Sequence, residues 1–234
     1  VKVALGGDMT AGAGAEGGAG AYKQGKKMTT SCCPAFVNMI RQHFPTLLEH
    51  MSTTVSPMCA VSRMLKSEDP DVVTVFIGPC IAKKSESLDL SIQGNADYVL
   101  TMEEARAMMR ARGVELEPEP NSLQDGSVFG KRFGNGGGVT AAVLECLKES
   151  GENTDINVMK CNGAAECKKA LLLLRAGKLP ADFIEGMACV GGCVGGPSKH
   201  KSEQEAKKAR DLLIGQADAR EVHENLSRYP MDRF

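Results

Sequence analysis

Three short cysteine-bearing segments, each containing glycine or proline, most strongly constrain how this chain can fold. They lie far apart and read TSCCP at residues 30–34, GPCIAKK at 78–84 and MACVGGCVGGP at 187–197. The second and third directly follow predicted strands, and the first opens a predicted helix at Pro34. Loops at the carboxyl ends of parallel strands converge at one edge of a sheet. We therefore expect a fold that gathers thiols from distant segments at one place.

Predicted strands and helices alternate along the chain. The strands span 71–77, 97–101, 156–160 and 183–187, and the helices span 34–43, 56–66, 102–112, 138–149, 164–175 and 201–214. This alternation predicts an α/β fold with partly parallel sheets flanked by helices. The run DVVTVFI at 71–77 is nearly continuous in apolar residues, which predicts a strand buried on both faces. Residues 114–134 are expected to be rich in loops.

The nine cysteines do not indicate a disulfide framework. Their number is odd, and a chain of 234 residues is long enough to bury a core without covalent cross-links. We interpret the thiols as reduced, either buried in the core or bound to metal. The thiols expected in the core are those of Cys59, Cys146, Cys161 and Cys167.

Charge and hydropathy exclude several classes of protein. Lys and Arg total 28 against 29 Asp and Glu, so no basic excess is available to displace counterions from nucleic acid. No apolar stretch approaches the ~20 residues that a membrane helix needs. No signal peptide is visible, which predicts a cytoplasmic protein. The chain starts at Val1, so a missing upstream segment is left open.

One glycine motif near the N-terminus resembles a dinucleotide-binding fingerprint. Gly12, Gly14 and Gly17 spell G-x-G-x-x-G after a short apolar run. The acidic residue that holds the ribose is expected about 20 positions later. No Asp or Glu occurs between Gly17 and Glu49. We interpret the motif as a chance product of a stretch rich in glycine and alanine.

The spacing of the cysteines indicates which metal centre they suit. A ferredoxin-type C-x₂-C-x₂-C run is absent. Structural zinc uses paired C-x₂₋₄-C knuckles, and only Cys189 and Cys193 have that spacing. Four thiolates gathered from separate loops suit a cubane iron–sulfur cluster. Buried structural cysteines and a zinc-stabilised binding module are the alternatives.

At these residues the chain resembles the catalytic domain of the [FeFe]-hydrogenases. That family carries T-S-C-C-P, P-C-x-x-K-K and M-A-C-x-x-G-C in this order, and all three motifs are present here. The combination TSCCPAF with GPCIAKK is similar to the group B branch. The resemblance covers about four fifths of the chain, from Gly7 to Pro197. It implies an H-cluster-binding catalytic domain at 1–200, without N-terminal ferredoxin-like domains, and a helical extension at 201–234.

The resemblance implies a role for each cysteine of the three motifs. Cys33, Cys80, Cys189 and Cys193 would hold a [4Fe-4S] cluster. Cys193 would also bridge to a two-iron centre that carries carbon monoxide, cyanide and an azadithiolate. Cys32 would be the last proton relay beside the open iron. As a free thiol with a reference pKa of ~8.5, it suits acid–base work.

The resemblance also implies a set of residues around the two-iron centre. Lys83 would donate a hydrogen bond to a cyanide, and its charge beside Cys80 favours thiolate. Phe133 would line the pocket and Met187 would pack near the dithiolate. Two positions depart from the family, because Met58 replaces a common Gln and Gly78 a common Met. The proton path would include Ser52 and the weaker candidate Glu16.

The implied activity is reversible hydrogen turnover, 2 H⁺ + 2 e⁻ ⇌ H₂, by an iron–sulfur oxidoreductase of anaerobic hydrogen metabolism. The implied partners are ferredoxin or another one-electron carrier, the proteins that install the two-iron centre, and a further subunit or domain. Two alternatives remain open. One is a hydrogenase-like sensor of hydrogen or redox state, and the other is a non-catalytic iron–sulfur assembly or scaffold protein.

Overall fold

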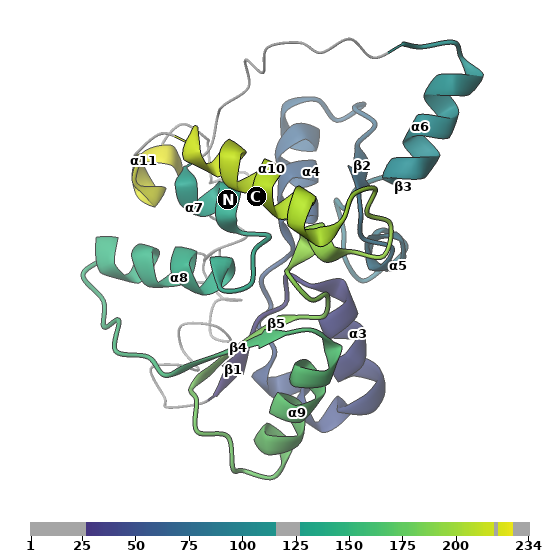
Figure 1. Cartoon of the computed structure of the whole chain (residues 1–234). Coiled ribbons are helices and arrows are strands. Elements are labelled where there is room, and N and C mark those ends of the chain that lie inside the picture. Colours follow the sequence, from purple (N-terminus) through teal and green to yellow (C-terminus); the bar gives the residue numbers. More distant parts are fainter. Residues whose placement is uncertain (1–26, 116–126, 218–219, 227–234) are drawn as a thin grey trace.

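The computed structural model describes residues 27–115, 127–217 and 220–226, and its strands form two parallel sheets (Figure 1). The first sheet has the order β1-β5-β4, with strands Met28–Thr29, Phe183–Met187 and Val158–Asn162. The second sheet pairs β2 (Val75–Gly78) with β3 (Tyr98–Thr101). Every strand pair runs parallel. The predicted α/β architecture with parallel sheets flanked by helices is confirmed.

The first sheet is buried because helices cover both of its faces. Helices α3 (Pro34–His43) and α9 (Ala164–Arg175) lie on one side and α8 (Gly138–Glu149) on the other (Figure 1). The central strand β5 is buried along its whole length, and Ile184 is 0% exposed. A Cβ on Gly186 would lie 2.2 Å from the ring of Phe36, so only glycine lets α3 approach the strand this closely.

The second sheet is smaller and is covered less completely. Helices α4 (Pro57–Glu68), α5 (Ala82–Ser87) and α6 (Met102–Ala111) accompany it. Its core contains Met58, Ala96 and Val99, with Phe76 packed against them. Two of these three helices are capped at their N-termini by side chains: Ser56 caps α4, and Thr101 forms a capping box with Glu104 on α6.

The burial predicted for the strand at 71–77 is wrong. The strand is shorter, β2, and its exposure alternates, with Val75 48% and Ile77 45% exposed. In the described part of the chain this strand belongs to a two-stranded sheet. Phe76 points into the small core while Val75 and Ile77 point away from it, as the period of a half-buried strand requires.

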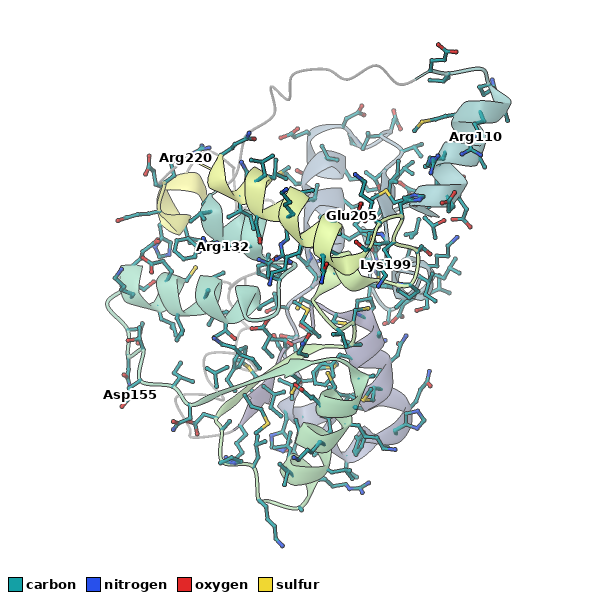
Figure 2. All side chains as sticks on the ribbon, viewed as in Figure 1. Arg110, Arg132, Asp155, Lys199, Glu205 and Arg220 are labelled. Atoms are coloured by element: carbon teal, nitrogen blue, oxygen red, sulfur yellow. The ribbon has the colours of Figure 1, made fainter. Side chains whose placement is uncertain are left out.

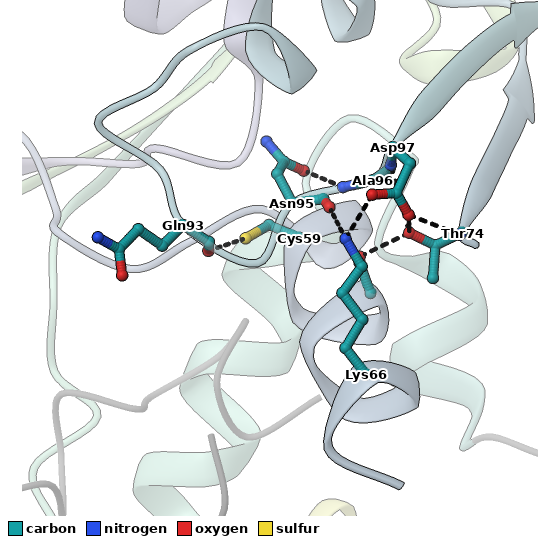
Figure 3. A network of polar contacts seen from close by, with 8 residues as sticks. Cys59, Lys66, Thr74, Gln93, Asn95, Ala96 and Asp97 are labelled. Atoms are coloured by element: carbon teal, nitrogen blue, oxygen red, sulfur yellow. Dashed lines mark hydrogen bonds and ion pairs between the residues drawn. The ribbon is translucent and has the colours of Figure 1, made fainter. Parts of the chain in front are cut away.

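A polar network fastens α4 to the loops beside the second sheet (Figure 3). The ammonium of Lys66 donates to the carbonyl of Asn95 and to Asp97 Oδ1, both at 2.8 Å. Asp97 Oδ2 accepts from the backbone N–H of Thr74 at 2.7 Å and from its hydroxyl at 2.8 Å. The thiol of Cys59 donates to the carbonyl of Gln93 at 3.9 Å. Cys59 is 0% exposed, so it belongs to the core as expected.

The remaining elements are short helices and a C-terminal pair. Residues 45–50 and 193–195 form 3₁₀ turns, and the loop-rich region predicted at 114–134 contains α7 (Val128–Arg132). The predicted helix at 201–214 is α10 (Glu203–Gly215), which is followed by α11 (Val222–Leu226). None of the described helices is both long and apolar enough to cross a bilayer. The division into a domain at 1–200 and an extension at 201–234 stays a prediction.

Candidate functional site

The first cysteine segment begins at the carboxyl end of β1 and continues into α3. The amide of Thr30 donates to the carbonyl of Ile184 at 2.9 Å, and the hydroxyl of Thr30 accepts from the Gly186 amide at 3.0 Å. Cys33 is the N-cap of α3, and Pro34 occupies its first turn. A strand of two residues carries too little sequence signal to be predicted. This segment therefore also follows a parallel strand, like the other two.

The second segment begins at the end of β2 and lies against the third. The carbonyl of Pro79 accepts a hydrogen bond from the Ser198 amide at 3.1 Å. A Cβ on Gly196 would lie 2.5 Å from that carbonyl oxygen. The small residue at 196 thus allows the two backbones to meet. Cys80, one residue after Pro79, is brought beside the loop that carries Cys193.

The third segment leaves β5 and turns sharply between its two cysteines. Gly191 and Gly192 both have positive φ angles, of 81° and 82°. A Cβ on Gly192 would lie 2.3 Å from the carbonyl oxygen of Gly134. That same carbonyl accepts the Cys193 amide at 2.8 Å. Residues 134–138, which we name the glycine turn, therefore form the surface on which the Cys193 loop rests.

The four thiols assigned to the cluster lie within electrostatic range of one another. Cys193 is an exposed residue, but partial desolvation of its thiol raises its pKa to about 11, and the thiols of Cys33, Cys80 and Cys189 act in the same direction. Burial also raises the pKa of Cys189, with further contributions from Cys33 and Cys80. The ionised forms of Cys189 and Cys193 are disfavoured by the neighbouring thiols because like charges repel. The structure therefore brings together thiols from all three segments.

Two basic side chains oppose this effect. Lys83 lowers the pKa of the Cys193 thiol, and Lys199 lowers that of Cys189. Lys199, labelled in Figure 2, lies on the loop between the Cys193 turn and α10. Both lysines therefore lie within electrostatic range of a cysteine of the third segment.

The donor set fits an iron–sulfur cluster. Cluster irons prefer four cysteine thiolates, and a bound metal keeps such thiols deprotonated despite their mutual repulsion. Glycines at 134, 192 and 196 keep the surrounding backbone free of side chains. Among the described residues, no three His, Cys, Asp or Glu side chains form a group that would hold a single metal ion.

Cys32, Phe133 and Met187 come together in one apolar cluster. Phe133 is 9% and Met187 3% exposed, and the partly buried Cys32 packs against the cluster that they form with Val139 and Val222. Burial raises the pKa of the Cys32 thiol strongly. The nearby Cys33, Cys193 and Glu185 raise it further, while Lys83 lowers it.

Lys83 is buried and already has a partner. It is 8% exposed, and its ammonium pairs with Glu86 Oε2 at 2.6 Å. Its charge lowers the pKa of the thiols of Cys32 and Cys193, so the ammonium lies within electrostatic range of both. Lys84 points elsewhere and pairs with Glu104 at 2.8 Å.

The other predicted site residues lie in different places. Ser52 is 9% exposed; its amide donates to Thr29 at 2.9 Å and its hydroxyl to Thr54 Oγ1 at 3.0 Å. Met58 packs in the core of the second sheet, and Gly78 ends β2. Glu16 lies outside the described residues, together with the glycine motif at 12–17.

Glu185 is a functional candidate that the sequence reasoning missed. It is 0% exposed, and its carboxylate accepts hydrogen bonds from the amides of Gly137 at 2.8 Å and Thr140 at 3.0 Å, and from the Thr140 hydroxyl. A signal was present, because a glutamate interrupts the otherwise apolar strand FIEGM just before the third segment. A buried acid of this kind needs specific partners.

The remaining cysteines are core residues, as expected. Cys146, Cys161 and Cys167 are 2%, 3% and 0% exposed. Cys161 and Cys167 hydrogen-bond to each other within the core of the first sheet, which lowers the pKa of Cys161 and raises that of Cys167.

Known proteins with similar sequences include a hydrogenase subunit and an iron–sulfur cluster assembly factor. The periplasmic [Fe] hydrogenase large subunit of Nitratidesulfovibrio vulgaris is 32% identical over 211 residues, which is 71% of this chain and 50% of that protein. A cytosolic Fe-S cluster assembly factor of Xenopus tropicalis is 24% identical over 240 residues, 82% of this chain and 50% of that protein. The chain thus spans about half the length of these relatives.

Solved structures show the same fold. An apo [FeFe]-hydrogenase from Chlamydomonas reinhardtii matches with a TM-score of 0.65 at 23% identity, over 92% of this chain and 73% of that one. The family model that describes the C-terminal domain of the iron-only hydrogenase large subunit matches residues 1–197, which include all three cysteine segments. The chain therefore belongs to the family of iron-only hydrogenase large-subunit domains that this model defines.

Proposed function

We propose that the protein is an [FeFe]-hydrogenase that interconverts protons, electrons and H₂. The observation that carries the proposal is the convergence of thiols from three distant segments, each at the end of a parallel strand. Cys33, Cys80, Cys189 and Cys193 would hold a [4Fe-4S] cluster, and Cys193 would bridge to a two-iron centre with carbon monoxide, cyanide and azadithiolate ligands. When bound, this cofactor supplies electron storage and an open metal position.

The protein itself would bind the cofactor, shield the Cys32 thiol from water and transfer protons. Phe133 and Met187 form an apolar wall beside Cys32, which keeps water away from that thiol. Cys32 is adjacent in sequence to the proposed ligand Cys33, so ligation by Cys33 would hold Cys32 close to the cofactor. As an unligated thiol, Cys32 would give protons to and take them from the cofactor. Ser52 and Glu16 remain predictions for the outer proton path.

Lys83 would orient the cofactor. Its buried ammonium has three N–H donors, of which Glu86 uses one. A remaining donor would bind a cyanide of the two-iron centre, as the resemblance implies. The ion pair with Glu86 then holds the ammonium in place.

The first test is to mature the protein anaerobically with competent maturation proteins and record its infrared spectrum and H₂ turnover. Iron-bound carbonyl and cyanide bands with turnover are expected. Cys32→Ala and Cys32→Ser should keep the wild-type metal content and lose about 100-fold or more in turnover, the range of a lost general acid or base. Unchanged turnover in either variant removes Cys32 from the mechanism.

A second candidate function is iron–sulfur cluster assembly or scaffolding. Relatives named as cytosolic Fe-S cluster assembly factors align with 78–85% of this chain. This function predicts a bound iron–sulfur cluster, no carbonyl or cyanide bands and no turnover after the same maturation. The retained Cys32 beside Phe133 and Met187 favours the hydrogenase.

The proposed partners follow from the proposed activity. A one-electron carrier such as ferredoxin would exchange electrons with the cluster, and maturation proteins would load the two-iron centre. A cytoplasmic location and anaerobic metabolism belong to the same proposal. Relatives are named both as periplasmic and as cytosolic proteins.

A further inference from the structure

Glu185 performs an unusual capping task at the N-terminus of α8. In a capping box, the N-cap side chain accepts the amide of the third helical residue, and that residue's side chain accepts the N-cap amide. The N-cap of α8 is Gly137, which has no side chain for this, and the third helical residue is Thr140. Glu185 of β5 accepts both amides, and the Thr140 hydroxyl as well. One carboxylate from another element thus replaces both halves of the box.

All three hydrogen bonds of Glu185 are donated to its carboxyl oxygens. Two of its three donors are backbone N–H groups, which can only donate. Both carboxylate oxygens therefore act as acceptors, which suits the ionised acid. Burying an anion is costly, and here charge-assisted hydrogen bonds and the positive end of the twelve-residue helix α8 compensate for it.

The glycine turn lies between the Glu185 cap and the Cys193 loop and contacts both. Gly137 is the last-but-one residue of the glycine turn, whose first residue, Gly134, accepts the Cys193 amide. A Cβ on Gly134 would lie 3.4 Å from Cys193 Cβ, so the turn and the cysteine are in contact. Glu185 therefore fastens the turn at one end while the Cys193 loop rests on the other.

We propose that Glu185 is a positioning residue of the cysteine site: by capping α8 from β5, it fixes the glycine turn and through it the Cys193 loop. The inference rests on the proposed function only where it concerns the cluster. Loss of the carboxylate frees the turn and loosens Cys193, while Cys80 on the second sheet keeps its place.

The test is amide hydrogen exchange on the full 234-residue chain before cluster loading, for wild type and Glu185→Gln. Glutamine replaces one carboxylate oxygen with an N–H donor, so one of the backbone amides of Gly137 and Thr140 loses its acceptor. Exchange at Gly137, Thr140 and Cys193 should accelerate about tenfold or more, as expected when a charge-assisted hydrogen bond is lost. Glu104→Gln is the matched control, because Glu104 accepts the Thr101 amide at the N-terminus of α6. Because Glu104 also pairs with Lys84, this control should change exchange near Thr101 and Lys84 and leave Gly137, Thr140 and Cys193 as in the wild type.

Thiol labelling adds a readout that a general loss of stability does not move. In Glu185→Gln, Cys193 should react faster with iodoacetamide while the rate at Cys80 stays unchanged. After loading with iron and sulfide, this variant should also release its iron faster than Glu104→Gln. Exchange and labelling at Cys193 equal to those of wild type overturn the proposal.

A second pair of variants covers the case in which Glu185→Gln fails to fold. Thr140→Val removes only the hydroxyl donor and should accelerate exchange at Gly137 and Cys193, whereas Thr140→Ser should match wild type. Equal behaviour of the two variants contradicts the proposal. A wild-type chain that binds no cluster contradicts the proposed function alone, because exchange and labelling are measured without the cluster.

Discussion

The two parallel sheets that carry the candidate site differ strongly in how deeply they are buried. The first sheet carries Cys33, Cys189 and Cys193, and its central strand is buried throughout. The second carries Cys80 on a two-stranded sheet whose Val75 and Ile77 are half exposed. Three of the four proposed ligands therefore lie on the well-buried sheet and one on the less buried sheet. We infer that a cluster bound across them would act as a cross-link between the two sheets.

The largest expected difference is in core stability. Ile184→Ala should lower the free energy of unfolding by ~2–5 kcal/mol, because it opens a cavity in a fully buried core. Ile77→Ala, the same change on the half-exposed strand, should cost less than ~1 kcal/mol. Urea unfolding of both variants measures this directly. Equal losses would show that the second sheet is as well packed as the first.

The next effect concerns the contact between the second and third segments. Gly196→Ala places a Cβ 2.5 Å from the Pro79 carbonyl and should cost about 1–3 kcal/mol through overpacking. It should also weaken iron binding, because it separates Cys80 from the Cys193 loop. Gly177→Ala is the control: its φ of 66° strains an alanine, whereas Gly196 has a φ of −56°, and nothing lies within 4 Å of the Cβ added at Gly177. It should lower stability and leave iron binding intact.

Metal removal should affect the two sheets unequally. When iron is chelated from the loaded protein, amide exchange should accelerate in β3 of the second sheet. The amides of β4 should change little, because the packed core of the first sheet holds them without the metal. Hydrogen exchange followed by mass spectrometry resolves the two strands. Equal acceleration in both would contradict the cross-link.

The smallest effect is the contribution of Asp97, beside the second sheet, to the pH dependence of stability. Hydrogen bonds from Lys66 and then Thr74 lower the pKa of Asp97 from 3.8 to about 2. A lowered folded-state pKa stabilises the fold above the unfolded value, and this stabilisation disappears as the pH falls from about 4 to 2. Asp97→Asn should therefore flatten the acid side of the stability curve. Thermal melts at several acidic pH values compare it with wild type.

The sequence predicted helix boundaries correctly where a proline or a glycine marks the start of the helix. The helices at 34–43, 138–149 and 164–175 have the predicted bounds, because proline or glycine marks where each begins. The prediction that residues 71–77 are buried on both faces was wrong. An apolar run shows that a strand favours a core, but not whether helices cover both faces of its sheet. The helix at 82–87 was missed, because it is short and polar.

The candidate site was predictable in its members but not in its contacts. The three sequence motifs identified the cysteines, and in the structure Cys33, Cys80 and Cys189 lie within electrostatic range of Cys193. Glu185 was missed because its partners Gly137 and Thr140 lie more than forty positions away in the sequence. The support of Cys193 by Gly134 is a backbone contact of the same long range, which no local pattern encodes.

The central claim is that thiols from both sheets share one iron–sulfur cluster. The most direct test is anaerobic reconstitution with iron and sulfide, with iron and acid-labile sulfide counted per chain. We expect about four of each in the wild type, and the same in Cys59→Ala/Cys146→Ala, which removes two buried core thiols. Cys33→Ala/Cys80→Ala, which removes one ligand from each sheet, should lose the cluster. A full cluster in that double variant, or none in the wild type, would contradict the account.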